Sequence, residues 1–163
     1  MRRWFLGLIA VMILVAAFVA PPATAGDAPI GRLGDTLRIQ AGELSADVTV
    51  SSVLPSDIPP GFGYPPRWPR SQLYRAQVTV RPVDVPTPYA LASRLSFRGL
   101  TQTGDQYEPR ETDAPDALQY ALLNAPAGAT VSGGVWWDCY RDLVTNVVLI
   151  DPKTGFPLAQ WNI

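Results

Sequence analysis

The chain contains no histidine and one cysteine among its 163 residues. Without histidine, neither a Ser-His-Asp triad nor a Cys-His pair can form. Zinc and other transition metals also lack their usual ligands, because imidazole is missing and thiolate is almost missing. One cysteine cannot form a disulfide within the chain, so the fold must rely on its hydrophobic core. These absences argue against nucleophilic catalysis, against a transition-metal centre and for a protein without a cofactor.

Long apolar runs are equally scarce, and residues 5–20 form the one clear case. This run is shorter than the about 20 residues of a membrane-spanning helix, and two prolines follow it. A basic start, an apolar centre and small residues before the end are typical of a secretory signal. We expect a signal peptide over residues 1–25, cleavage between Ala25 and Gly26, and a mature domain over 26–163. No stable membrane anchor would remain after cleavage.

The first residues are compatible with two export routes. Arg2 and Arg3, followed by Phe5, resemble a twin-arginine signal. The short basic segment and the very apolar centre favour the general secretory route instead. No cysteine follows the apolar run, so the signal boundary offers no lipid attachment site. Twelve of the thirteen basic residues are arginine, which suggests a GC-rich, actinobacterial genome.

Positive charge is too sparse for a nucleic-acid partner. After removal of Arg2 and Arg3, eleven basic residues stand against fourteen acidic ones, for a net charge of −3. No cluster of basic residues interrupts this balance, so we expect neither nucleic acid nor an anionic membrane surface as a partner.

Alternation of apolar and polar residues is the dominant pattern of the mature chain, and helical periodicity longer than a turn or two is missing. In residues 74–80, "YRAQVTV", every second side chain is apolar, as in a strand with one buried face. Residues 144–150 are nearly all apolar and predict a central strand, whereas Pro157 predicts an edge strand after the turn at 151–155. The expected strands are 35–40, 46–54, 72–82, 90–98, 101–108, 117–123, 130–140, 143–150 and 156–161, with 117–123 also readable as a helical turn.

Short strands with Gly, Pro and Asp turns between them predict an all-β, immunoglobulin-like antiparallel β-sandwich of about seven to eight strands. Residues 55–69, "PSDIPPGFGYPPRWP", interrupt the pattern and must form a loop. Phe62, Tyr64, Arg67 and Trp68 make this loop the candidate partner-binding site, since aromatic and arginine side chains dominate binding hot spots. The alternative is that the aromatic residues fold back and cap the sandwich.

Several segments, in order, resemble one known family. They are "PIGRLGDTL" (29–37), "LYRAQVTVRPVDVPTP" (73–88), "LSFRGLTQTGDQYEP" (95–109), "GATVSGGVWWDC" (128–139) and "LVTNVVLIDPKTGFPLAQW" (143–161). Together they resemble the secreted immunoprotective extracellular protein family of mycobacteria. The resemblance implies an immunoglobulin-like β-sandwich, no enzymatic activity, no catalytic residues to transfer, and exposure to a host as an antigen.

Cys139 lies in "GGVWWDCY", where it shares a strand face with Val135 and Trp137. A nucleophilic cysteine needs a nearby base or positive charge, and the chain has no histidine to supply one. We interpret Cys139 as a core residue. The alternative is a reactive thiol or one that forms a disulfide between two chains. The expected oligomeric state is a monomer or a weak homodimer.

The acidic segment 105–116 is the remaining candidate for chemistry. It holds Asp105, Glu108, Glu111, Asp113 and Asp116. Calcium accepts carboxylates, but the spacing lacks the alternate positions and central glycine of a known calcium loop. Paired carboxylates also serve glycosidases, although fourteen acidic residues produce many accidental pairs. We expect a solvated loop and no metal site.

The sequence therefore predicts a secreted, extracellular or cell-wall-associated protein that is not an enzyme. The expected partner is a protein or a cell-surface or host component. A carrier of a small apolar ligand, which needs a cavity between the sheets, and a weak hydrolase using acidic residues are the alternatives.

Overall fold

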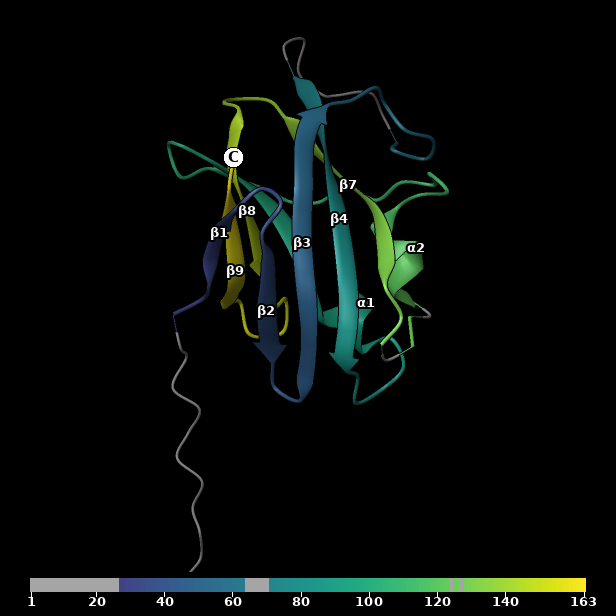
Figure 1. Ribbon diagram of the computed structural model, residues 1–163. Coiled ribbons are helices and arrows are strands. Elements are labelled where there is room, and N and C mark those ends of the chain that lie inside the picture. Colours follow the sequence, from purple (N-terminus) through teal and green to yellow (C-terminus); the bar gives the residue numbers. More distant parts are fainter. Residues whose placement is uncertain (1–26, 64–70, 124, 127) are drawn as a thin grey trace, which may run out of the picture.

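The computed structural model describes residues 27–63, 71–123, 125–126 and 128–163, which fold into two sheets packed face to face (Figure 1). The predicted signal peptide, with its cleavage between Ala25 and Gly26, lies outside the described residues. The elements in chain order are β1 (Ile30–Arg32), β2 (Thr36–Ala41), β3 (Leu44–Pro55), β4 (Gln72–Asp84), α1 (Ala90–Arg94), β5 (Ser96–Thr101), β6 (Gln106–Tyr107), α2 (Leu118–Leu123), β7 (Val131–Cys139), β8 (Val144–Ile150) and β9 (Pro157–Asn162).

One sheet has the strand order β2-β3-β4-β7 and the other has the order β1-β9-β8-β5-β6. Neighbouring strands are antiparallel, except that β1 runs parallel to β9. The predicted all-β sandwich is therefore confirmed. Nine strands form within the described ranges, and β1 was not among the predicted strands because its three residues are too few to show alternation. No helix in these ranges has the length and apolarity needed to cross a bilayer.

The alternation in β4 builds one wall of the core. Ala76, Val78 and Val80 are fully buried between the sheets, while the residues between them lie on the outer face. Each buried valine contributes about 1.5–3 kcal/mol relative to an exposed one. The nearly continuous apolar strand β8 lies between β9 and β5, as its sequence predicted for a central strand.

Trp137 of β7 joins the two sheets through the middle of the core. Its side chain is fully buried, and its indole N–H donates to the Phe97 carbonyl of β5 across 2.9 Å. Gly99, two residues further along β5, leaves room for the indole: a Cβ there would lie 3.3 Å from the ring and 2.9 Å from Val144. The large ring thus fits a gap in the opposite sheet, and its indole N–H is hydrogen-bonded.

The prediction of a strand over 90–98 is wrong in its first half. Ala90–Arg94 form α1, and β5 begins at Ser96. Within α1, Ala90 and Leu91 are buried, and the N–H of the buried C-cap residue Leu95 donates to the Leu91 carbonyl at 3.1 Å. The helix starts from Tyr89, whose φ of 67° turns the chain out of the extended conformation.

Two further segments differ from a strand. Residues 117–123 form α2 over Leu118–Leu123, which buries Leu118 and Leu122 four residues apart and packs against β7 (Figure 1). The predicted strand 101–108 is interrupted: Thr101 ends β5 and Gln106–Tyr107 form β6. Residues 102–105 turn back between them, under a hydrogen bond of 3.0 Å from the Thr101 N–H to the Asp105 carbonyl.

The assignment of the last strand to an edge is also wrong. β9 lies between β1 and β8, with Ile30 opposite Gln160 and Arg32 opposite Asn162. Pro157 is compatible with this interior position because it is the first residue of β9 and precedes the residues that pair with β1.

A buried ion pair anchors α1 to the turn between β8 and β9. The Arg94 guanidinium donates to both carboxylate oxygens of Asp151, with 2.9 Å between Nε and Oδ1. The same carboxylate accepts from the Lys153 N–H at 3.0 Å and from the Thr154 hydroxyl at 3.2 Å. Burial alone would raise the pKa of Asp151, but these hydrogen bonds and the positive charge of Arg94 outweigh burial and hold that pKa below its ordinary value.

We expect Asp151→Asn to lower the free energy of unfolding by about 2 kcal/mol at pH 7, since it leaves Arg94 without its charged partner. Because the carboxyl pKa is lower in the folded state, its contribution is present above about pH 4 and disappears as the pH falls through the folded-state pKa. Urea unfolding at neutral and acidic pH should show the difference between variant and wild type shrinking in acid. Asp47→Asn, which removes the carboxylate of the exposed Arg38 pair, serves as the control and should cost less. Equal losses would contradict the anchoring role.

Candidate binding surface at the loop end

Phe62, one of the four residues predicted to bind a partner, instead caps the outer face of a sheet. Phe62 is only 3% exposed and packs on the outer face of the four-stranded sheet. Its buried neighbours are Leu73, Ala114, Ala117 and Trp136. Tyr64, Arg67 and Trp68 lie outside the described residues, so binding through these three side chains stays a prediction.

Residues 110–114 hold the loop in place. The Pro60 carbonyl accepts from the Asp113 N–H at 2.8 Å and from the Thr112 hydroxyl at 2.6 Å. The Arg110 guanidinium donates to the Phe62 carbonyl at 2.9 Å and lies 4.5 Å from the centre of the Phe62 ring. The cap is therefore fixed by main-chain, side-chain and cation–π contacts together.

An open cleft of about 510 Å³ lies beside Arg110. Short strand β6, the segment after it and the end of β7 supply its walls. It is lined by Gln106, Tyr107, Glu108, Arg110, Asp138, Tyr140 and Arg141. None of these was a predicted site residue, because the sequence does not show that the loop after β6 and the end of β7 meet. The clustering of tyrosine and arginine in "QYEPR" (106–110) and "CYR" (139–141) was the available signal.

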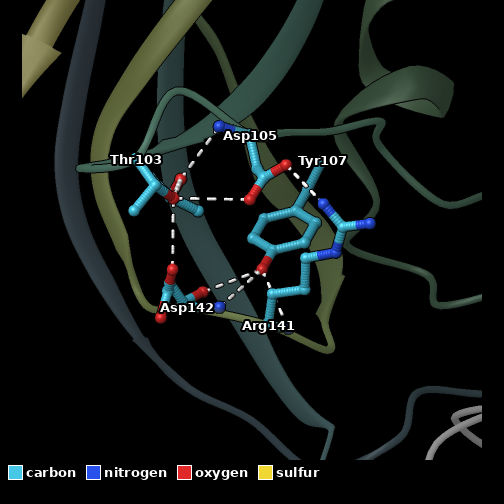
Figure 2. A network of polar contacts seen from close by, with 6 residues as sticks. Thr103, Asp105, Tyr107, Arg141 and Asp142 are labelled. Atoms are coloured by element: carbon cyan, nitrogen blue, oxygen red, sulfur yellow. Dashed lines mark hydrogen bonds and ion pairs between the residues drawn. The ribbon is translucent and has the colours of Figure 1, made fainter.

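Tyr107 organises one wall of the cleft (Figure 2). Its hydroxyl accepts from the N–H groups of Arg141, at 3.1 Å, and Asp142, at 3.0 Å, and donates to the Asp142 carbonyl at 2.9 Å. Burial raises the pKa of Tyr107 although the two N–H donors act in the opposite direction, so the hydroxyl keeps its proton. Thr103 and Asp105 extend the network, with 2.7 Å between the Asp105 carboxylate and the Arg141 guanidinium.

Asp138 and Tyr140 are the two distinctive groups of the cleft. Asp138 is 9% exposed, its Oδ1 atom has no hydrogen-bond partner in the described structure, and Oδ2 lies 3.7 Å from Arg110. Tyr140 is 43% exposed and meets the Tyr107 ring edge-on, with 5.4 Å between ring centres. The cleft thus combines a poorly paired buried carboxylate with an accessible aromatic ring.

The acidic segment 105–116 forms ion pairs with arginine. Asp105 pairs with Arg141, Glu108 pairs with Arg98, and Asp116 pairs with Arg75. Across the described ranges, His, Cys, Asp and Glu side chains nowhere gather in threes as a metal site would require. These three carboxylates face guanidinium groups instead of one another.

Cys139 lies in the core, as predicted from the strand face that it shares with Val135 and Trp137. It is buried beside Trp137, and desolvation, with a smaller contribution from the charge of Asp138, raises the pKa of its thiol to about 12. The thiol is therefore protonated at neutral pH and poorly placed for chemistry.

Comparison with known proteins identifies the fold. No family model and no curated protein matches the chain. The structure is similar to the crystal structure of MPT63, a secreted protein from Mycobacterium tuberculosis, with a TM-score of 0.66. The chain shares its fold with MPT63. The two are 22% identical, and the similarity covers 85% of this chain and 100% of MPT63. The resemblance read from the sequence is confirmed at the level of the fold.

Gly61→Ala tests the cap. Gly61 has a φ of +69°, and an added Cβ would lie 2.1 Å from the Asp113 carboxylate and 2.6 Å from its backbone nitrogen. We expect a loss of about 3 kcal/mol in the free energy of unfolding, measured by urea titration. Gly42→Ala is the matched control, because Gly42 has a φ of +67° with open space around it, and it should cost about 1 kcal/mol. Similar losses in both variants would show that the loop is not held against residues 110–114.

Cys139 should resist thiol reagents in the folded protein. With its pKa raised to about 12, almost no thiolate is present at pH 8. We expect no reaction with Ellman's reagent under native conditions and one thiol per chain in denaturant. Rapid modification of the native protein, or a covalent dimer released by reductant, would instead establish an accessible cysteine.

Proposed function

We propose that the protein is exported, is not an enzyme, and binds a protein or another cell-surface or host component through the loop end of its sandwich. The observation that carries the proposal is the open, prearranged cleft of tyrosine and arginine side chains beside the capped loop. Tyrosine and arginine are the residues that most often anchor binding interfaces, and fixed walls reduce the entropy lost on binding.

Export is supported by the signal pattern of residues 1–25 and by the similarity to MPT63, which is described as a secreted protein. Cleavage between Ala25 and Gly26 would release the sandwich, with its N-terminal residues close to β1. The protein would then act outside the cell or in the cell-wall zone.

The two alternatives have less support. A carrier needs an internal cavity, but the cavity lined by Leu95, Phe97, Leu118, Leu122 and Val135 has only about 100 Å³, below the 300 Å³ of a typical ligand pocket. A hydrolase built on the acidic segment needs a carboxylate free to act as acid or base, and three of the five carboxylates there, Asp105, Glu108 and Asp116, pair with arginine instead.

A pull-down from cell-surface extracts with residues 26–163 tests the binding function. We compare the wild type with a Tyr64→Ala, Trp68→Ala variant of the loop and an Arg141→Ala variant of the cleft. At least one of the two should lose a component that the wild type recovers, because each removes a hot-spot type of side chain. Intact-mass measurement of the exported protein, which should start at Gly26, tests the signal peptide.

Phe156→Ala is the matched control for the pull-down. Phe156 is 62% exposed in the turn between β8 and β9, at the opposite end of β8 from the cleft. It should recover the same components as the wild type. Equal recovery by all variants, or no component recovered by the wild type, would contradict binding at the loop end.

A further inference from the structure

The chemistry of the cleft indicates which ligand it would take, and this inference rests on the proposed binding function. A buried polar atom without a hydrogen bond costs about 1–3 kcal/mol, and such atoms are rare in folded proteins. Asp138 departs from this rule because Oδ1 lacks a partner and Oδ2 has only the distant guanidinium of Arg110. The carboxylate is therefore available to accept a hydrogen bond if its side chain turns toward a donor in the cleft.

The charges that line the cleft cancel. Glu108 and Asp138 supply two carboxylates, and Arg110 and Arg141 supply two guanidinium groups. A cationic ligand would meet the arginines and an anionic ligand would meet the carboxylates, so neither sign is favoured. A hydroxyl group can both donate to a carboxylate and accept from a guanidinium, and it therefore matches both kinds of wall.

The aromatic wall adds an apolar contact. Tyr140 is 43% exposed at the cleft, and the negative face of its ring attracts the weakly positive C–H groups of a ring-shaped ligand. The Arg141 guanidinium lies 5.8 Å from the ring centre, at the outer limit of a cation–π contact. Molecules that offer hydroxyl groups on their edges and C–H groups on a face are sugars.

We propose that the cleft between β6 and the end of β7 binds an uncharged saccharide, with Asp138 and Arg110 hydrogen-bonded to its hydroxyl groups and Tyr140 packed against the sugar ring. The volume of about 510 Å³ falls within the range of small-ligand sites and accommodates one or two sugar units. Tyr107 acts as a positioning residue, since its hydroxyl fixes the backbone of Arg141 and Asp142 that follows Tyr140.

The test uses purified residues 26–163 on an array of immobilised oligosaccharides with three arms. One arm holds neutral hexose and N-acetylhexosamine oligomers, the second sialylated or sulfated ones, and the third oligomers with free amino groups. We expect the neutral arm to bind, followed by titration calorimetry with the strongest binder. Binding confined to either charged arm, or to none, would overturn the inference.

Variants then test whether the sugar binds at Asp138 and Tyr140. Asp138→Asn keeps the shape of the side chain and removes its charge, and Tyr140→Ala removes an exposed ring, so both should fold. Each should weaken binding of the neutral saccharide about tenfold or more, because hydrogen bonds to charged groups and aromatic contacts have that effect. Tyr120→Ala is the matched control: Tyr120 is also 43% exposed but lies on α2, and its removal should leave the affinity unchanged.

The urea midpoints of all three variants verify folding. If Asp138→Asn does not fold, the saccharide affinities of Tyr140→Ala and Tyr120→Ala still test the site. Equal affinity of Tyr140→Ala and the wild type would overturn the site. Loss of saccharide binding on the array with retained recovery of a protein component in the pull-down would end the saccharide inference and leave the binding function standing. Failure of both assays would remove both.

Discussion

The contact between Trp137 and the opposite sheet is the constraint on which the rest of the structure depends. It fills the space between the sheets with the largest available side chain and gives its N–H the carbonyl of Phe97. Gly99 is small because this ring needs the space. With Trp137 fixed, the residues before and after it on β7 must face outward. Trp136 therefore covers the outer cluster with Phe62, and Asp138 lines the cleft.

The two ends of the sandwich differ in how completely their polar groups are paired. At one end, the ion pair of Arg94 and Asp151 ties α1 to the turn between β8 and β9, and the carboxylate oxygens are hydrogen-bonded. At the other end, the Tyr107 hydroxyl fixes the backbone of Arg141 and Asp142, and Asp138 is left poorly paired. Unsatisfied groups in an otherwise well-paired protein tend to mark the place where another molecule completes the structure. We infer binding at that end for this reason.

The sequence predicted what depends on neighbouring residues and missed what depends on distant ones. Alternation identified β3 and β4, and a nearly continuous apolar run identified β8, because each has enough residues to show its pattern. Short segments such as 90–94 were misassigned, since five residues are too few to distinguish the period of a helix from that of a strand. The loop with Phe62 was found by composition, but its burial depends on residues 110–114, fifty positions away. The cleft was missed for the same reason.

The pairing of β1 with β9 joins residues 30–32 to residues 160–162, which is nearly the greatest separation that the described chain allows. A polypeptide delivered across a membrane from its amino end would present β1 long before its neighbour emerged. The five-stranded sheet would then lack β9, the strand between β1 and β8, until the last few residues arrived. In the meantime β8 would have one edge without hydrogen-bonding partners. If export threads the chain unfolded through a narrow pore, this topology postpones completion of the five-stranded sheet until β9 has emerged.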